Sequence, residues 1–530
     1  MTDGDSISPC DQLYDDAERA TLHLVSIRSV SPSPGERDAA EAVLRLLQAD
    51  GLKYDAMGIA PLPGDRHGRG NAYVLLLGRS PETVVLTGHL DTVGTRDFGD
   101  LEPYALHPDR LAQRMPVPDG WLAGRGIADM KSGVGAMIAV LRCLARRPRS
   151  ERPLSIIMAA TPDEENESAG MLALPALLLR LRADHDLRLV GAINTDVSTP
   201  ARPDDPYRYV YTGTIGKLLV GYYVVGRAAH AGAPHEGIDA NLLAAEIIRD
   251  VSLAHDLGET VRNTESPPPV TLHAADLKSE YNTQIPHEAS ISLNVLTLER
   301  TPAEVLGALS RRAETSLARA LGSLARARGV RSEGGAVLTY EELFQTAAGA
   351  AGEDRVKEVV EGAWESAAGD LRDRSLTVVR RLFSLAALNG PAVVLYLAPP
   401  YYPHLPEMRS PLSDALRAAV SAHSADNVQV REFFPLLSDM SYLSLAPDLG
   451  LAELIRTMPA WGRREGYSLP VDAIRRLAIP AVNIGPHGEG IHGPAERVLA
   501  DHAFRVVPRL ILETISELST RVLSPLTPTR

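Results

Sequence analysis

The chain has 530 residues, of which 45% are hydrophobic, 23% charged and 5% aromatic, and its formal net charge is −13. A chain of this length is too long for one ordinary hydrophobic core, so we expect two or more domains. The acidic balance argues against nonspecific binding to nucleic acid or to an anionic membrane, and no apolar run reaches the roughly 18 residues of a membrane span.

The N-terminal stretch MTDGDSISPCDQLYDDAERA is acidic and lacks the apolar core of a secretory signal, which favours a cytoplasmic protein. Cys10 and Cys143 are the two cysteines of the chain, and neither belongs to a CxxC motif. They cannot form a disulfide scaffold. Any metal ion would therefore have to be held by His, Asp and Glu side chains.

The first 210 residues alternate between helical and strand patterns. Helices are predicted at about 36–50, 132–147 and 171–181, and strands at 71–77, 83–91, 154–160 and 188–196. Short apolar strands separated by helices are typical of an α/β layer with a largely parallel sheet.

The run TPDEENES, residues 161–168, places four acids directly after the strand predicted at 154–160. Its local pattern predicts the start of a helix, with Thr161 at the N-cap, Pro162 at the first helical position and Glu164 completing a capping box. The helix dipole favours acids in a first turn, so Asp163 and Glu167 need no further explanation.

After residue 210 the pattern changes. Strands are predicted at 217–226, 288–298 and 391–399, and helices at 239–253 and 303–327. This is the β-α-β-β-α-β-like order of a ferredoxin-like α+β domain.

An insertion at about 336–388 is rich in Ala and charged residues and is predicted to be mostly helical. We expect it to pack on the α+β domain, although it could alter a dimer edge or narrow the substrate entrance. The tail returns to α/β patterns, with a helix at 413–423 and a strand at 479–486. The expected architecture is a split α/β catalytic domain, 1–210 and 403–530, with an α+β domain inserted at 211–402.

Metal-ligand side chains stand at the ends of predicted strands or in the loops that follow them. They are His89 and Asp91 in LTGHLDTVG, Asp129 in GRGIADMKSG, Glu164 and Glu165 in TPDEE, Asp196 in INTD, and His492 in IGPHGEGIHGP. Ligands of open parallel sheets bind beyond the carboxyl ends of the strands. One dinuclear site explains all of these positions together.

Each position also has a simpler explanation when it is taken alone. His89 could be a hydrogen-bonded core histidine, Asp129 a helix N-cap and Asp196 a turn residue. His487 lies close to His492 and is an alternative ligand. Residues two apart on a strand share a face, so the carboxylate of Asp91 can reach His89 and fix its tautomer.

Other enzyme classes find little support in the sequence. There is no G-x-S-x-G motif for a serine nucleophile, and there is no HExxH, Walker or dinucleotide-binding glycine motif.

In chain order, GHLDTV, GRGIADMKSG, TPDEE, NTD, GRAAHAGAPHEGIDANLLAA and IGPHGEGIH resemble the motifs of a two-zinc family of exopeptidases and deacylases. This family includes aminoacylase, acetylornithine deacetylase, succinyl-diaminopimelate desuccinylase and glutamate carboxypeptidase. Within it, the chain looks most like the bacterial arginine-utilisation (RocB-like) branch, through TGTIGKLLVGYYVVG, REFFPLLSDMSYLSL and the long insertion. The resemblance spans almost the whole chain and implies a zinc-exopeptidase-like catalytic domain with an inserted lid and dimerisation domain.

The resemblance also implies the ligand set of two zinc ions. Asp129 would bridge the ions, His89 and Asp196 would complete one site, and Glu165 and His492 would complete the other. The peptide bond between Asp129 and Met130 would be cis.

The remaining roles concern catalysis and substrate. The resemblance implies that Glu164 is the general base and that Asp91 supports His89. It places His230, in GRAAHAGAP, over the tetrahedral oxyanion, often from the other subunit of a dimer. Asn282, before the Ile-Pro pair, would contact the substrate.

Acidic oxygen ligands with one His per metal suit Zn²⁺, although Mn²⁺ or Co²⁺ could substitute. Two such ions can activate a shared water, and a neighbouring glutamate can take its proton. One departure from the family concerns the substrate. The family usually has an arginine on the strand after the Ile-Pro pair to bind a substrate carboxylate, and this chain has Asn294 and Leu296 there.

We therefore expect a dinuclear-zinc hydrolase that cleaves an amide bond of an N-acyl amino acid or small peptide-like substrate, in arginine or amino-acid catabolism. The expected assembly is a homodimer through the inserted domain, with no nucleic-acid or membrane partner. The alternative is a catalytically silent family member that binds a small ligand or metal in the same cleft.

Overall fold

The computed structural model describes residues 12–330, 334–407 and 409–523; Cys10 lies outside these ranges. The chain divides into two compact units. The first contains Met1–Thr214, Leu405–Leu445 and Pro470–Arg530, and the second contains Ile215–His404 and Ala446–Leu469.

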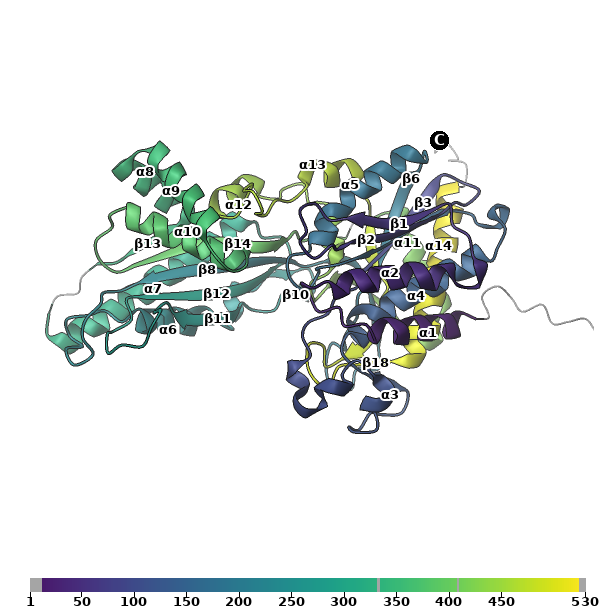
Figure 1. The fold of residues 1–530 in the computed structure, drawn as a ribbon, viewed down its shortest axis with the longest axis horizontal. Coiled ribbons are helices and arrows are strands. Elements are labelled where there is room, and N and C mark those ends of the chain that lie inside the picture. The colour runs from purple at the N-terminus through teal and green to yellow at the C-terminus, as the bar shows by residue number, and fades with distance from the viewer. Residues whose placement is uncertain (1–11, 331–333, 408, 524–530) are drawn as a thin grey trace, which may run out of the picture. The chain divides into compact units, whose positions relative to one another are not determined.

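The first unit is built on an eight-stranded sheet of order β1-β2-β5-β3-β6-β16-β7-β15 (Figure 1). Its strands are β1 (Ala56–Pro61), β2 (Gly70–Leu76), β3 (Glu82–His89), β5 (Ser155–Thr161), β6 (Arg188–Asn194), β7 (Arg208–Thr214), β15 (Val428–Phe434) and β16 (Ala481–Asn483). The pairs from β5 through β3 and β6 to β16 are parallel, as is β7 with β15. This arrangement confirms the predicted α/β class with a mostly parallel central sheet.

Helices cover both faces of this sheet (Figure 1). One layer contains α1 (Leu13–Val25), α2 (Gly35–Gln48), α4 (Ser132–Ala145), α11 (Pro411–Ala422) and α14 (Val507–Leu523), and the other contains α5 (Ala169–Asp184) and α13 (Val471–Leu477). Helix α4 is the central one, since all its residues from Ser132 to Leu144 are buried. It approaches α1 closely at Gly135, where an added Cβ would lie 2.2 Å from Oγ1 of Thr21.

Three short strands and a short helix complete the first unit. The strands β17 (Gly488–Glu489), β18 (Arg497–Leu499) and β4 (Trp121–Ala123) form a separate antiparallel sheet in that order, and α3 spans Pro108–Leu111. The pairing of β18 with β4 joins the C-terminal part of this unit to the segment that precedes α4.

The helix start predicted in TPDEENES is wrong. Strand β5 continues through Thr161, and α5 begins only at Ala169. Thr161 does not cap a helix, because its hydroxyl contacts the carbonyl of Gly88 at 3.3 Å and the carboxylate of Asp439 at 3.1 Å. The acids between strand and helix form a loop in which Asp163 is buried and has a positive φ of 74°.

The second unit contains a five-stranded sheet of order β11-β12-β8-β14-β13. Its strands are β8 (Gly216–Val225), β11 (Val270–Asp276), β12 (Glu288–Thr297), β13 (Ala336–Thr339) and β14 (Ala392–Tyr402); two-residue strands β9 (Thr260–Val261) and β10 (Thr264–Glu265) form a hairpin. All neighbours in the sheet are antiparallel except β13 with β14. Helices α6 (Ala240–Val251) and α7 (Pro302–Arg328) pack on each other, and α6 packs on β11 and β12.

The predicted helical insertion contains one strand, β13, and three helices. These are α8 (Tyr340–Ala351), α9 (Glu353–Ser366) and α10 (Leu371–Leu385). Helix α10 packs on β8 and β14, and α8 packs on β13 and β14. The insertion therefore extends the sheet by β13 and packs helices against it.

Assigning all of 403–530 to the catalytic domain is wrong for one segment. Residues 446–469 belong to the second unit, where α12 (Leu451–Thr457) packs against α7, α8 and β14. The indole N–H of the buried Trp364 donates to the carbonyl of Arg464 at 2.9 Å, and Arg463 pairs with Glu361 at 2.6 Å. These contacts with the insertion hold the segment in the second unit.

Among the described residues, no helix combines the length and apolar character that crossing a membrane requires.

Candidate metal centre

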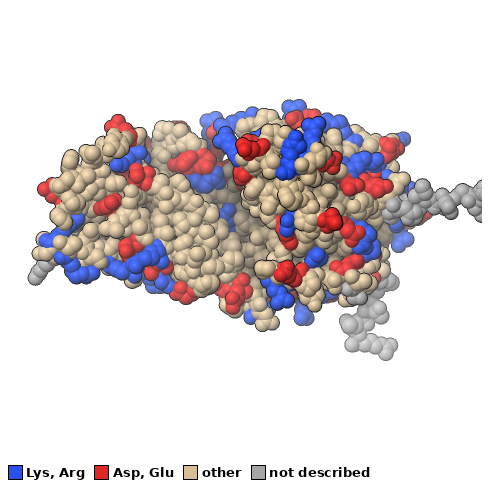
Figure 2. All heavy atoms as spheres, turned by 90° about the horizontal axis from the view of Figure 1, so that it is seen from below, with Lys and Arg blue, Asp and Glu red and all other residues tan. Residues whose placement is uncertain are grey.

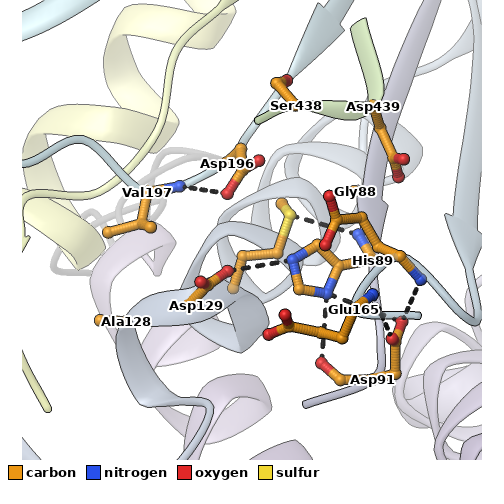
Figure 3. Close-up of polar contacts among 12 residues, drawn as sticks. Gly88, His89, Asp91, Ala128, Asp129, Glu165, Asp196, Val197, Ser438 and Asp439 are labelled. Carbon is orange, nitrogen blue, oxygen red and sulfur yellow. Dashed lines mark hydrogen bonds and ion pairs between the residues drawn. The ribbon is translucent and has the colours of Figure 1, made fainter. Parts of the chain in front are cut away.

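The predicted ligands come together in the first unit, at the carboxyl ends of its central strands. Figure 3 shows His89, Asp129, Glu165 and Asp196 among them. His89 is the last residue of β3, and Asp196 lies two residues beyond the end of β6. Glu165 lies in the loop after β5, Asp129 in the turn before α4, and His492 in the loop after β17. The parallel strands β3, β5 and β6 lead to His89, Glu165 and Asp196 at one edge of the sheet, and the turn of Asp129 and the loop of His492 reach the same place.

The ligand atoms form two groups of three that share one residue. His89, Asp129 and Asp196 form one group, and Asp129, Glu165 and His492 form the other. Within each group, one potential ligand atom per residue lies within 4.8 Å of the others. Asp129 is thus positioned as a bridging carboxylate between two possible ion sites.

The two oxygens of Asp129 face different histidines. Its Oδ1 lies 3.0 Å from Nε2 of His89, and its Oδ2 lies 3.4 Å from Nε2 of His492. The same nitrogen of His492 lies 3.0 Å from Oε1 of Glu165. The peptide bond between Asp129 and Met130 is cis, as the resemblance implies.

Asp91 plays a somewhat different part from the one expected. The nearest partner of His89 Nδ1 is the backbone carbonyl of Asp91 at 3.1 Å, while the carboxylate Oδ1 is 3.7 Å away. The carboxylate instead accepts hydrogen bonds from the backbone N–H groups of Glu164, at 3.1 Å, and Glu165, at 2.9 Å. Asp91 therefore orients His89 through its main chain and the Glu164–Glu165 loop through its side chain (Figure 3).

The electrostatics of the site fit divalent cations. Burial lowers the pKa of His89, but its hydrogen bond to Asp129 and the surrounding carboxylate charges outweigh this and raise the pKa well above its ordinary value. Hydrogen bonds to the same Asp129 and to Glu165 raise the pKa of His492 to about 11. Burial, together with neighbouring carboxylate charge, raises the pKa of Asp196 well above its usual range.

Positive charge is therefore favourable beside this cluster of carboxylates. In the described part of the chain, the imidazoles of His89 and His492 are the only basic groups recorded in ion pairs with Asp129 and Glu165. Two neutral imidazoles and three carboxylates form a donor set of nitrogen and oxygen that suits Zn²⁺, Mn²⁺ or Co²⁺. Divalent ions at this position would replace the protons and neutralise the acids.

Glu164 lies beside these ligands without belonging to either group. Its side chain is half-buried, and burial raises the pKa of its carboxyl group well above the usual value, with a further contribution from the charge of Glu165 and an opposing one from His89. A carboxyl group with a raised pKa therefore lies next to the metal-ligand cluster.

A buried ion network stabilises the loop that carries Glu164 and Glu165. The carboxylate of Asp163 accepts hydrogen bonds from Arg69, at 2.5 Å, and from the hydroxyl of Ser31, at 2.9 Å. Arg69 also contacts Glu36 at 3.2 Å and Asp65 at 2.9 Å. Asp163 is therefore the anchor of the loop and not simply an exposed acid in a first helical turn.

His230 and Asn282 lie in the second unit. Their segments are neighbours, since His230 forms a bridge with Gln284, and the N–H of Ala231 donates to the carbonyl of Thr283 at 2.8 Å. Both side chains are exposed. The structure thus brings these two predicted residues to one exposed pair of loops in the second unit.

His487, the alternative ligand, belongs to neither group. It is buried against His502, with ring centroids 6.3 Å apart, and its backbone N–H donates to Nδ1 of His502 at 3.1 Å. Burial lowers the pKa of His487 to about 4, so it is a neutral core histidine.

Two further buried acids, Asp439 and Glu496, lie near the site. Asp439 accepts the hydroxyl of Thr161 through Oδ2, and its Oδ1 is buried without a recorded hydrogen-bond partner among the described residues. Glu496, four residues after His492, accepts hydrogen bonds from the backbone of the Asp129 turn. The position of Glu496 shortly after a ligand histidine was a usable signal, whereas Asp439 lacks any local signature.

Comparison with known proteins places these features in context. The sequence profile of peptidase family M20/M25/M40 matches residues 85–516. The uncharacterized protein YqjN of Bacillus subtilis is 32% identical over 82% of this chain and 84% of its own length, and Protein RocB of the same organism is 30% identical over 94% of both chains. Among solved structures, the dipeptidase Dug1p of Saccharomyces cerevisiae has a similar fold, with a TM-score of 0.57 and 13% identity over 98% of both chains.

Proposed function

Because the chain belongs to peptidase family M20/M25/M40 and is a metal-dependent hydrolase, we propose that it is a dinuclear-zinc enzyme that cleaves the amide bond of an N-acyl amino acid or a small peptide-like substrate. The similarity to RocB over 94% of both chains supports membership of the RocB-like branch, for which we propose a substrate from arginine or amino-acid catabolism. The observation that carries the proposal is the pair of ligand groups that share Asp129.

The proposed ligand roles follow from this sharing. Asp129 would bridge the two ions, His89 and Asp196 would hold one of them, and Glu165 and His492 would hold the other. When bound, two divalent ions lower the pKa of a shared water and polarise a carbonyl group. The protein supplies the fixed positions of these side chains, which Asp91 and Asp163 help to maintain from outside the ligand set.

Glu164 is the proposed proton carrier. It accepts a proton from the attacking water and passes it to the nitrogen of the leaving amine, so the carboxylate returns to its starting state. Glu164 and Glu165 are adjacent in sequence but have different proposed roles, Glu164 in proton transfer and Glu165 in metal binding. The hydrogen bonds from both backbone N–H groups to the single carboxylate of Asp91 keep the two residues in a fixed relation.

His230 and Asn282 are proposed to contact the substrate. An imidazole can stabilise the developing oxyanion by donating a hydrogen bond, and an amide can hold a substrate carbonyl or amide group. On β12, Asn294 lies opposite Leu219 and Leu296 lies opposite Lys217 of β8. Neither Asn294 nor Leu296 can form the bidentate ion pair of an arginine, which favours substrates without a required free carboxylate at that position.

We also propose a homodimer through the second unit. Its edge strand β11 exposes Val270 by 37% and Leu272 by 59%, and Leu253 nearby in the sequence is 63% exposed. Figure 2 shows that the face of this unit seen from below has a broad area with few charged side chains. An exposed apolar edge strand favours pairing with a second copy.

The test of the proposed function combines metal analysis with a substrate screen. Purified protein should contain two equivalents of a divalent metal, and it should hydrolyse one or more members of a panel of N-acyl amino acids and dipeptides supplied with Zn²⁺, Mn²⁺ or Co²⁺. Protein that binds neither metal nor substrate would contradict the proposal. Protein that binds two metals but hydrolyses nothing across the panel would favour a catalytically silent binding protein.

A further inference from the structure

The carboxylate of Glu496 is bound to the backbone of the turn that carries Asp129. Its Oε1 accepts hydrogen bonds from the N–H groups of Ala128, at 3.2 Å, and Asp129, at 3.3 Å. Its Oε2 accepts one from Nη1 of Arg125 at 2.6 Å. Glu496 is 1% exposed. It belongs to neither of the two metal-ligand groups.

The short segment 492–496 therefore contacts Asp129 at two points. Glu496 holds its main chain, and His492, four residues earlier, faces its side chain at 3.4 Å. The pairing of β18 with β4 adds a backbone link, since the N–H of Gly124 donates to the carbonyl of Glu496 at 3.1 Å. Residues 492–496 thus connect the loop of His492 to the turn of Asp129, although Asp129 and Glu496 are 367 positions apart in the sequence.

Arg125 makes this arrangement electrostatically stable. Its guanidinium is 1% exposed and also contacts Asp97 at 2.5 Å and the carbonyl of Gly94 at 2.9 Å. A buried carboxyl group needs a cation or hydrogen-bond donors as partners. Glu496 has both, since one oxygen contacts Arg125 and the other accepts from the two backbone N–H groups.

We propose that Glu496 is a positioning residue that fixes Asp129 in its bridging orientation, and that Arg125 holds Glu496 for this purpose. The inference rests on the proposed metal centre. Because Asp129 is shared, loosening its main chain weakens both ion sites together. Partners outside the ligand set typically change metal affinity by about 10- to 100-fold when they are removed.

The experiment measures metal affinity and ligand geometry in the full-length protein. Glu496→Gln keeps the length of the side chain but replaces one carboxylate oxygen and removes the charge that Arg125 compensates. Competition with a chelator should show dissociation constants for Zn²⁺ that are about 10- to 100-fold higher at both sites. The visible absorption of the Co²⁺-loaded protein should change, because the geometry around the shared ligand has changed.

Glu489→Gln is the matched control. Glu489 lies in β17 of the same small sheet and also pairs with an arginine, Arg497, but it is 32% exposed and makes no recorded contact with Asp129. Its replacement should leave metal affinity within about threefold of the unchanged protein, since exposed ion pairs contribute little. Should Glu496→Gln fail to fold, Glu496→Asp, which keeps the charge and shortens the reach, takes its place with the same expectation.

The outcomes separate the two proposals. Unchanged protein that binds no metal overturns the proposed metal centre. If unchanged protein binds two ions and the Glu496 variant binds them with the affinity and Co²⁺ spectrum of Glu489→Gln, then the metal centre stands and the positioning role of Glu496 is refuted. Arg125→Lys keeps a cation beside Glu496 but loses the planar guanidinium that contacts Glu496, Asp97 and Gly94 together, so it should weaken metal binding, though less than Glu496→Gln does. Metal affinity equal to that of the unchanged protein would refute the role of Arg125.

Discussion

The buried ion network under the Glu164–Glu165 loop leads to a quantitative prediction for Arg69→Met. Arg69 is 8% exposed and contacts Glu36 at 3.2 Å and Asp163 at 2.5 Å, whose side chains are 0% and 1% exposed. Methionine retains most of the apolar stem but removes the guanidinium, which among the described residues is the positive group that pairs with these two acids. Removal of one partner of a buried ion pair costs about 3–5 kcal/mol, because the remaining charge is left buried without compensation.

Native-state hydrogen exchange followed by mass spectrometry measures this cost where it arises. Peptides that cover β2, β5 and the loop up to α5 report the free energy of local opening in the first unit. Because about 1.4 kcal/mol corresponds to a tenfold change in an equilibrium constant, exchange in these peptides should become roughly 100- to 4,000-fold faster in Arg69→Met. Peptides from the second unit should exchange as in the unchanged protein.

Arg37→Met is the control for this prediction. Arg37 lies next to Glu36 in α2, is 57% exposed and pairs with Glu41 at 3.1 Å. An exposed pair of this kind contributes about 0–1 kcal/mol, so exchange should change by less than about fivefold. If Arg69→Met had no larger effect than Arg37→Met, the network would contribute nothing to stability, and the reasoning about the anchored loop would be refuted.

Three further predictions concern the site and the insertion. Glu164→Gln should lower kcat at least about 100-fold while both metal equivalents are retained, since general acid–base catalysis contributes about 10²–10⁴-fold. A parallel loss of metal would instead indicate that Glu164 is a metal ligand. Treatment with a chelator should abolish hydrolysis, and added Zn²⁺ should restore it, with circular dichroism as the control for folding. Activity that survives complete metal removal would refute the metal mechanism. Trp364→Ala should destabilise the second unit by about 3–5 kcal/mol, because the indole is 1% exposed and binds the carbonyl of Arg464, and it should leave metal content unchanged. Equal exchange rates in α9, α10 and residues 446–469 before and after the change would contradict this.

Much of the candidate site follows from the sequence because of the geometry of parallel sheets. The strands that end at His89, Thr161 and Asn194 are apolar runs that can be recognised locally. Since parallel strands end at one edge, ligand-type residues that follow each strand are expected to meet there, however far apart they are in sequence. The structure brings His89, Asp129, Glu165, Asp196 and His492 together at that edge.

Features that depend on a distant partner could not be predicted in this way. The local pattern of TPDEENES favours a capping box, but Asp163 pairs with Arg69, 94 positions away, and Thr161 contacts Asp439, 278 positions away. A short-range capping interaction is worth only about 1 kcal/mol, so a buried ion pair and a continued strand can override it.

The domain boundaries and the environment of the metal ligands also depend on partners that are distant in sequence. The sequence by itself determined the class of fold, the strands that lead to His89, Glu165 and Asp196, and the residue types that can hold two divalent ions, since all of these depend on local patterns. Only the tertiary structure decided that residues 446–469 pack with the insertion and that Glu496 binds the backbone of Asp129. These contacts join segments through buried polar groups, and the partner of a buried polar group is selected by the whole fold and not by its neighbours in the chain.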